Sequence, residues 1–286
     1  MRLAILADTH GNLPAQEAVL EDVERMHVDG MVIAGDYVGC PHAIECLQLL
    51  RQQNAWMIRG NSDTSELIHA AGKAPPEEYT NHQFALGRWV HAHLDADSLA
   101  FLSNLPEQLV IDLPGLPSIR VVHGSPSSPL SKLYDNGEMA LLTEALAQTD
   151  ESVLVCGHTH MQWNLWLNGK LALNPGSTAC PLDGRVGAQY SLLTAEDGRW
   201  QVQHRHMTYD LGRIRRDFTY SGLLEQGGAL ARAFLLSIET AQNVSLDFLN
   251  LGFALAASMG YDKVEFIPDE VWERAEAVFP WSDWTT

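Results

Sequence analysis

The stretch ILADTHGN, residues 5–12, ends an apolar run in an acid and a histidine that stand two positions apart. Residues 2–7 predict a short buried strand, and on an extended chain Asp8 and His10 project toward the same side. Both side chains bind metals in proteins. A simpler interpretation is that Asp8 caps the next element and His10 is a loop histidine, so the pattern needs support from elsewhere in the chain.

Composition and charge limit the classes of protein that fit. The 286 residues are enough for one large domain or one domain with an appendage, and 46% hydrophobic with 19% charged residues is ordinary for a globular protein. The formal net charge of -18 repels a nucleic-acid backbone and an anionic membrane. We therefore expect neither a duplex nucleic acid nor a membrane as partner.

Cysteine usage and the absence of targeting signals indicate a cytoplasmic protein. The four cysteines form no C-x-x-C pair, which is typical of reduced thiols: Cys40, Cys46, Cys156 and Cys180. The chain enters a strand at once, without a signal-type segment. Residues 246–259 are apolar but too short for a membrane span and contain Asp247 and Asn250, so they predict a buried or partner-covered helix.

Strand and helix patterns alternate in the first part of the chain and predict an α/β fold. We expect strands at 2–7, 30–34 and 55–58 with helices at 14–25 and 41–53 between them. A polar, histidine-bearing segment follows at 64–93, to which no element is assigned, and then a helix at 97–104. Strands at 108–112 and 119–123, a helix at 138–148, and five strands between residues 152 and 206 complete two sheets stacked between helices.

Beyond residue 207 the pattern becomes helical. Residues 221–242, 245–259 and 268–278 predict helices with broad apolar faces. We expect a catalytic domain over residues 1–206 and a helical extension over residues 207–286. Because such faces are too apolar for water, the extension either docks on the catalytic domain or pairs with a second copy in a homo-oligomer.

The arrangement of Asp8 and His10 recurs at one further strand end, and three others each add one candidate ligand. The stretch VLVCGHTH delivers His158 and His160, MVIAGDYVG places Asp36, WMIRGNSD places Asn61, and IRVVHG places His123. Any one of these could be a turn former or a satisfied buried histidine, but five in a row are hard to dismiss. Oxygen and imidazole donors without a thiolate suit manganese, iron or zinc. Seven donors are too many for one tetrahedral site and suit two metals sharing a carboxylate.

The ordered series DTH, GDYVG, GNSD, VHG and GHTH resembles the calcineurin-like metallophosphoesterase superfamily, in particular its compact bacterial and archaeal phosphodiesterases, over about residues 1–206. The resemblance implies a four-layer αββα sandwich that hydrolyses phosphodiester or nucleotide-type substrates with two divalent metals, manganese foremost and iron, zinc or nickel as alternatives. It implies that Asp8, His10 and His160 hold one metal, that Asn61, His123 and His158 hold the other, and that Asp36 bridges them. A metal-bridging hydroxide would attack phosphorus, with Asp36, Asn61 and His123 as catalytic residues. The segment LNPGS at 173–177 would have a structural role.

One departure from the family pattern concerns the leaving group. Many members have histidine where this chain has Ser62, and that histidine is taken to assist the leaving group. We therefore expect substrates with stable leaving groups, such as aryl diesters and phosphoanhydrides, to react ahead of alkyl esters. Arg59 could face the phosphate, although a surface salt bridge is at least as plausible.

Two other functions compete with hydrolysis. The same fold serves as a non-catalytic protein-binding scaffold in a retromer subunit, but all seven ligand positions are filled here. A DNA nuclease is opposed by the net charge of -18.

Several further residues are expected to be structural. His91 and His93 could lie at the rim of a pocket, but a solvated surface is the simpler interpretation. His204 and His206 predict a structural role on the last strand. The late tryptophans are expected to pack the extension: Trp272, Trp281 and Trp284.

Overall fold

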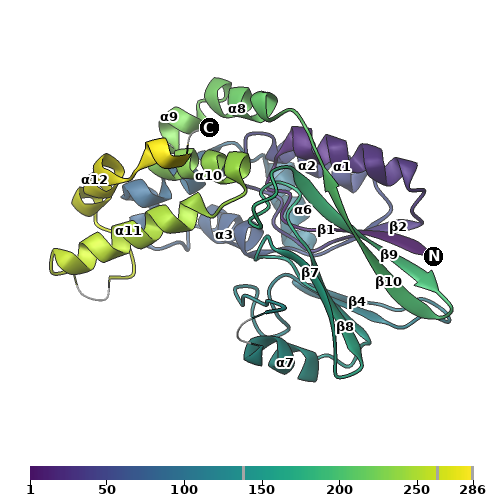
Figure 1. Cartoon of the computed structure of the whole chain (residues 1–286). Helices are drawn as coiled ribbons and strands as arrows, with labels where there is room; N and C mark the ends of the chain where they lie inside the picture. Colours follow the sequence, from purple (N-terminus) through teal and green to yellow (C-terminus); the bar gives the residue numbers. More distant parts are fainter. Residues whose placement is uncertain (137–138, 262–263, 285–286) are drawn as a thin grey trace.

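The computed structural model describes residues 1–136, 139–261 and 264–284, and its strands form two five-stranded sheets (Figure 1). The first, in spatial order, contains β10 (Arg199–Met207), β9 (Ala188–Glu196), β1 (Arg2–Leu6), β2 (Gly30–Ile33) and β3 (Ala55–Met57). The second contains β4 (Gln108–Ile111), β5 (Ile119–Val122), β6 (Val153–Val155), β8 (Lys170–Pro175) and β7 (Gln162–Leu167). β1, β2 and β3 run parallel, as do β5, β6 and β8, so the carboxyl ends of these strands meet at one edge.

Alternating side chains give each sheet two buried faces. Along β1, Leu3 and Ile5 point between the sheets, whereas Ala4 and Leu6 point toward the core under α1 (Leu13–Arg25) and α2 (Ala43–Arg51). On the far side, α7 (Ala140–Ala147) covers β5, β6 and β8. The order helix, sheet, sheet, helix confirms the predicted four-layer αββα sandwich. The predicted start of α7 at residue 138 lies outside the described residues.

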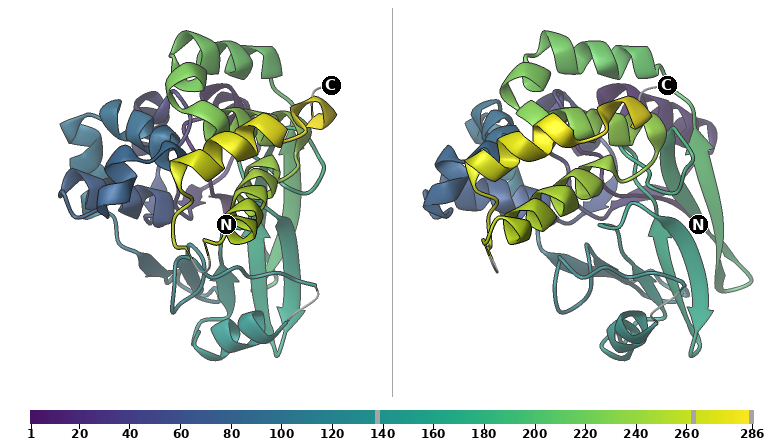
Figure 2. Two further views of the ribbon diagram at one scale, coloured as in Figure 1. Left: turned by 90° about the vertical axis from the view of Figure 1, so that its left-hand side faces the viewer. Right: turned by 60° about the vertical axis from the view of Figure 1, so that its left-hand side comes forward.

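The segment between β3 and β4 differs from the sequence prediction because it is largely helical. It contains α3 (Asn61–Ala70), α4 (Pro76–Thr80), η1 (His82–Phe84), α5 (Ala85–Ala92) and α6 (Ala96–Asn104). The first four are short. The helix α3 buries only Asp63 and Glu66, and the eight residues of α5 are too few to give a clear apolar period. Of these elements, α5 and η1 pack against the C-terminal helices, which Figure 2 shows beside this segment.

The C-terminal part is helical as predicted, with different boundaries. It contains α8 (Leu211–Tyr220), α9 (Leu223–Gln226), α10 (Gly228–Thr240), α11 (Val244–Ser258), α12 (Asp269–Val278) and η2 (Trp281–Trp284). The single helix expected over 221–242 is broken because Gly222 and Gly228 have φ values of 80° and 63°. The helix α8 was not predicted. Residues 262–263 and 285–286 of the predicted extension lie outside the described residues.

The extension is packed on the sandwich and also has a core of its own. Ile214, Phe218 and Leu235 join the core on the outer face of the first sheet. Phe248 and Trp272 lie in a separate core of the extension, with their rings 4.9 Å apart. The expected packing role of the late tryptophans agrees with this second core, against which Trp281 and Trp284 are partly buried.

Two simple expectations can be compared with the described residues. All four cysteines are buried with free thiols. No helix in the described part of the chain is both long and apolar enough to cross a membrane.

Candidate metal centre

The loops that follow β1, β2, β3, β5 and β6 bring all seven predicted ligands to one place. Potential donor atoms fall into two groups, within which they lie no more than 4.8 Å apart: Asp8, His10 and His160, and Asp36, His123 and His158. Asn61 adjoins the second group, with its Oδ1 2.9 Å from Nε2 of His123. Parallel strands place their carboxyl ends at a common edge, which explains why residues so far apart in sequence converge.

The backbone of these loops is strained at the predicted ligands. Nine described residues other than glycine have a positive φ, and five of them are predicted ligands: Asp8 (53°), His10 (41°), Asp36 (59°), His158 (66°) and His160 (57°). A residue with a Cβ in this region costs on the order of 1–3 kcal/mol. Such conformations persist where the surrounding structure fixes them, and they gather at functional sites. The strain therefore supports a functional role for these loops independently of the sequence motifs.

Three of the four histidines are oriented by the backbone. Their Nδ1 atoms lie against carbonyl oxygens: His10 on Val38 at 2.7 Å, His123 on Ala34 at 2.7 Å and His160 on Cys180 at 2.8 Å. A carbonyl oxygen only accepts, so Nδ1 carries the hydrogen and donates it. Each Nε2 is left to face the centre, which is the usual arrangement of a metal-binding histidine.

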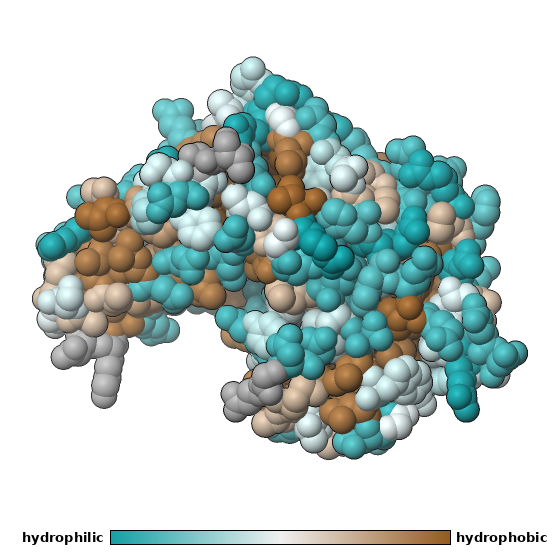
Figure 3. All heavy atoms as spheres, in the orientation of Figure 1, coloured by the Kyte–Doolittle hydropathy of each residue, from teal (hydrophilic) through white to brown (hydrophobic). Residues whose placement is uncertain are grey.

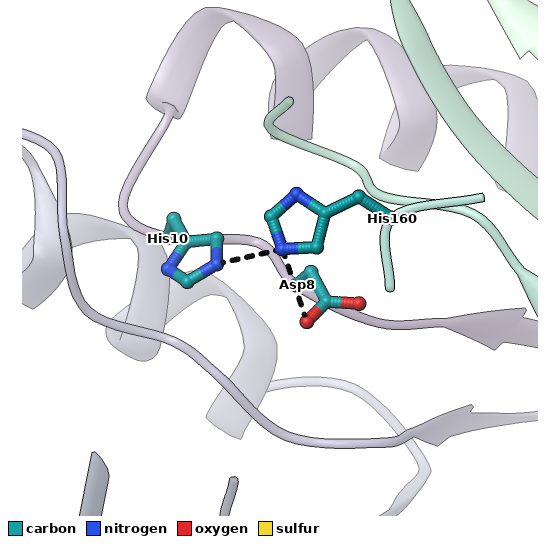
Figure 4. Close-up of side chains that lie close together, drawn as sticks. All are labelled: Asp8, His10 and His160. Carbon is teal, nitrogen blue, oxygen red and sulfur yellow. Dashed lines mark hydrogen bonds and ion pairs between the residues drawn. The ribbon is translucent and has the colours of Figure 1, made fainter. Parts of the chain in front are cut away.

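The first group has a donor set that fits a metal ion. Figure 4 shows His10, His160 and Asp8 turned toward one another. The Nε2 atoms of the two histidines are 3.2 Å apart, and Nε2 of His160 is 3.5 Å from Oδ1 of Asp8. With both Nδ1 hydrogens donated to carbonyls, the neutral rings would face each other lone pair to lone pair. A divalent cation among the three atoms satisfies all of them.

Asp36 lies between the two groups. Its Oδ2 is 3.3 Å from Nε2 of His123 in the second group and 3.8 Å from Nε2 of His10 in the first. The ring of His158 lies 5.2 Å from that of His123. This is the position that a carboxylate bridging two ions would occupy.

The electrostatics of the centre favour positive charge among the carboxylates. Burial opposes protonation of His123, but the Asp36 carboxylate outweighs it and raises the pKa of His123 to about 9. Burial also opposes the charged form of Asp36, yet His123 holds the pKa of Asp36 below its ordinary value. At His160 burial is outweighed by Asp8, and the pKa of His160 is raised. Metal binding should therefore release protons from the centre.

Ser62 and Asp63 fix Asp36 in place. The backbone N–H of Ser62 donates to Oδ1 of Asp36 at 2.8 Å, and its hydroxyl donates to Oδ2 at 2.9 Å. The buried carboxylate of Asp63 accepts the backbone N–H groups of Asp36, Tyr37 and Gly60 at 2.8–2.9 Å. The sequence placed Ser62 beside the centre but did not reveal that it binds Asp36.

The segment at 173–177 positions the loops of the centre, in agreement with the predicted structural role. Asn174 donates to the carbonyl oxygen of Gly157 at 2.7 Å, immediately before His158. The hydroxyl of Ser177 donates to the carbonyl oxygen of Asp8 at 2.8 Å. These two bonds tie the loops after β1 and β6 to β8.

A cleft of about 580 Å³ opens beside the centre. Its floor contains His10, Asp36, Asn61, His158 and His160. On one side α3 lines it with Ser62, Ser65 and Glu66. The rest of its wall is mostly apolar and comes from η1, α5, α10 and α11: Phe84, Leu86, Val90, Leu230, Phe234 and Leu249. Neither lysine nor arginine is found among the described residues that line it. The sequence did not predict this wall, because its helices are distant along the chain.

A second, smaller cleft meets the first at the centre. It has a volume of about 290 Å³ and adds Lys132 and Tyr134. Five residues line both clefts: His158, His160, Phe234, Ser245 and Leu249. Both clefts thus offer space next to the centre.

The remaining predicted candidates lie elsewhere. Arg59 forms a salt bridge with Glu107 at 2.6 Å, as the simpler interpretation has it. His204 contacts the Ser191 hydroxyl at 2.8 Å, which fits a structural role.

His91 and His93 both lie on α5. Residues two apart on a helix point to different faces, so the two histidines do not share one. His93 stacks on Trp89 with ring centres 3.8 Å apart, whereas His91 contacts Glu66.

Comparison with known proteins gives a consistent result. The family description "calcineurin-like phosphoesterase superfamily domain" matches residues 1–198. An uncharacterized protein of Methanocaldococcus jannaschii is 26% identical over 225 residues, which cover 73% of this chain and 88% of that protein. A metallophosphoesterase from Sphaerobacter thermophilus has a TM-score of 0.67 and 26% identity over 84% of this chain and 99% of its own.

A further solved structure shares the fold. It is a hypothetical protein from Pyrococcus horikoshii, with a TM-score of 0.68, 23% identity, and coverage of 79% of this chain and 95% of its own. The Sphaerobacter protein matches 84% of this chain, which is more residues than the range 1–206 contains. Its similarity to this chain therefore extends into the C-terminal helices.

Proposed function

The chain belongs to the calcineurin-like phosphoesterase superfamily, and we propose that it is a phosphodiesterase that uses two divalent metal ions. The observation that carries the proposal is the seven-residue centre, in which backbone carbonyls turn three Nε2 atoms toward buried carboxylates. Oxygen and imidazole donors are compatible with Mn²⁺, which we favour, and with iron, zinc or nickel.

Each residue has a distinct task in this proposal. Asp8, His10 and His160 would hold one ion, Asn61, His123 and His158 the other, and Asp36 both. Such a pair of ions supplies an activated water for attack on phosphorus, a hydroxide bridging the two ions in the usual scheme, and positive charge for the transition state. Ser62 and Asp63 keep Asp36 in position, while the orienting carbonyls hold the imidazoles.

The clefts favour a diester that carries organic substituents. A diester has two groups on phosphorus, and two adjoining clefts both reach the centre. The larger has an apolar wall and neither lysine nor arginine among its described lining residues, which suits an aryl group or a nucleobase better than further phosphates. A small phosphate ester or nucleotide-type substrate is therefore proposed, with a diester preferred over a monoester.

The proposal is tested by metal loading and hydrolysis. Metal-free protein is given Mn²⁺, Fe²⁺, Zn²⁺ or Ni²⁺, bound metal is counted, and rates are measured on bis(4-nitrophenyl) phosphate and 4-nitrophenyl phosphate. We expect two ions per chain and faster hydrolysis of the diester. His160→Gln should lower both metal content and rate, whereas His204→Gln, a matched change outside the centre, should lower neither.

A negative result would favour the competing function. A protein that binds metal but hydrolyses neither ester, nor any member of a nucleotide panel, would be a non-catalytic interaction scaffold on this fold. The filled ligand set argues against that outcome.

The net charge and the exposed hydrophobic residues suggest where the protein is located and what it binds. We propose a cytoplasmic protein that binds no duplex nucleic acid, in keeping with its net charge of -18. Phe253 on α11 and Met259 just after it are exposed hydrophobic residues, and Figure 3 shows apolar side chains on the surface at that end of the extension. These residues would form the contact of a homo-oligomer.

A further inference from the structure

A buried carboxyl group lies in the larger cleft, one helical turn beyond Ser62. Glu66 is four residues after Ser62 on α3, so their Cα atoms are separated by about 6 Å along the helix and share a face. Both residues line the cleft, together with Ser65. Only 7% of Glu66 is exposed, which is unusual for a glutamate without a cationic partner. A buried carboxyl group beside a candidate catalytic centre is therefore a candidate for a functional role.

Glu66 is held by a histidine that leads to solvent. Its Oε2 lies 3.1 Å from Nδ1 of His91 on α5, whose side chain is 25% exposed. The ring of His69 packs against that of His91 with centres 4.1 Å apart, and neither nitrogen of His69 has a hydrogen-bond partner among the described residues. When His91 donates its Nδ1 hydrogen to Oε2, the other oxygen of Glu66 is free to carry a proton.

The charges around Glu66 favour its neutral form. Burial, reinforced by Asp63 on α3 and Glu78 on α4, raises the pKa of Glu66 to about 8. Burial, reinforced by His69, lowers the pKa of His91, so this neighbour is neutral as well. Lining residues from η1, α10 and α11 carry no titratable side chain: Gln83, Phe84, Leu230, Phe234, Ser245 and Leu249. Glu66 is therefore a carboxylic acid at neutral pH.

We propose that Glu66 is the general acid that protonates the leaving group, taking the place of the histidine that Ser62 replaces. The inference rests on the proposed phosphodiesterase function. Ser62 cannot serve, because its hydroxyl hydrogen is donated to Asp36. A proton from Glu66 would reduce the disadvantage of alkyl esters that we expect from Ser62.

Atoms, electrons and protons all balance in the proposed step. Water delivers its oxygen to phosphorus and one proton to solvent, while the bond from phosphorus to the leaving oxygen breaks and its electron pair stays on that oxygen. The leaving oxygen takes the proton of the Glu66 carboxyl and departs as an alcohol. The Glu66 carboxylate regains a proton from solvent by way of His91, so one water is consumed per diester.

The test is a leaving-group series on the metal-loaded, full-length protein. Rates are measured for alkyl and aryl phosphodiesters that differ in leaving-group acidity, and log kcat is plotted against leaving-group pKa. In Glu66→Gln the amide still accepts from His91 but cannot donate an acidic proton. We expect alkyl esters to lose about 10²–10⁴-fold and 4-nitrophenyl esters less than about tenfold, so the plot becomes steeper.

Controls separate this role from a structural one. Glu78→Gln removes a nearby carboxylate that does not line the cleft, and should leave the slope unchanged. Metal content should be equal in all variants. For alkyl esters, the natural protein should lose activity above about pH 8, and Glu66→Gln should lack that decline.

Three results would overturn or redirect the inference. An equal loss for every substrate would show that Glu66 is structural, and an unchanged slope would show that it has no part in proton transfer. Either result leaves the phosphodiesterase function standing, because the natural protein is active. A natural protein inactive on every diester would instead overturn the function itself, and the inference with it.

Discussion

The two sides of the larger cleft are built in different ways. On one side, loops at strand ends present buried polar side chains on strained backbone, and five of the nine described non-glycine residues with positive φ are there. On the other side, α5, α10 and α11 present apolar side chains such as Val90 and Phe234 on regular helices. The first side holds the chemistry in place, and the second shapes the space for the substrate.

The difference between the two sides shows that metal binding and substrate selection depend on different parts of the chain. Each strand-end loop is a local unit, in which a strand, a glycine and the functional residue occur within a few positions. The helical side exists only when residues 61–92 and the C-terminal helices pack together. We therefore expect mutations in the strand-end loops to change the reaction rate, and mutations in the helical side to change which substrates are preferred.

Removing the C-terminal helices should have the largest effect. A chain ending at Tyr209 loses α8–α12, and with them Phe218, Leu235 and other members of the core on the first sheet. We expect aggregation, because that core would face water. Light scattering after size exclusion is the measurement. Phe248→Ala, confined to the extension's own core, should cost about 3–5 kcal/mol without aggregation. A soluble, active truncated protein would show that the strand-end side stands alone.

Asp36→Asn should abolish most activity while leaving the fold intact. Asp36 faces both donor groups, so losing its charge weakens both metal sites. We expect a drop of about 10³-fold or more in kcat, equivalent to about 4 kcal/mol, and more than for any other single ligand. Metal content and steady-state rates provide the measurement. A loss of only a few-fold with both metals retained would contradict the assignment of Asp36 as the bridge.

Glu66→Gln should change how stability depends on pH. The pKa of Glu66 is raised from 4.5 to about 8 in the folded protein, so between these values the folded state keeps a proton that the unfolded state has released. The contribution of this proton to the free energy of unfolding is fully present below about pH 4.5 and is lost as the pH rises through about 8.

The difference in free energy of unfolding between the natural protein and Glu66→Gln should therefore fall by a few kcal/mol over that window. Denaturant titrations of both proteins at several pH values measure it, and their difference cancels the other titrating groups. A difference that does not vary with pH would mean that Glu66 is ionised at neutral pH.

Phe234→Ala should have the smallest effect and act on specificity. The ring of Phe234 packs edge-on against His10 with centres 5.8 Å apart and lines both clefts. We expect KM for aryl diesters to rise by about tenfold, consistent with about 1–3 kcal/mol for a lost apolar contact, while methyl esters change little. Phe253→Ala, on the exposed surface of α11, is the matched control. Equal effects on aryl and methyl esters would place Phe234 in a structural role.

The sequence predicted the helices and strands best where apolar residues recur with a clear helical or strand spacing. The strands of both sheets and the helices α1, α2 and α11 lie close to their expected positions. The helices α3, α5 and α8 were missed, because each is short and buries few residues. The break before α10 required Gly228 in a left-handed conformation, which a composition-based pattern does not reveal.

By itself, the sequence determined the layered sandwich and which candidate ligands gather at the centre. It could do so because each ligand follows a strand directly, and parallel strands end at a common edge. Only the tertiary structure decided that Ser62 holds Asp36 and that Glu66 shares the cleft with a wall drawn from α5, α10 and α11. Those contacts join residues up to about two hundred positions apart, and no local pattern of side chains records which distant helix will cover a face.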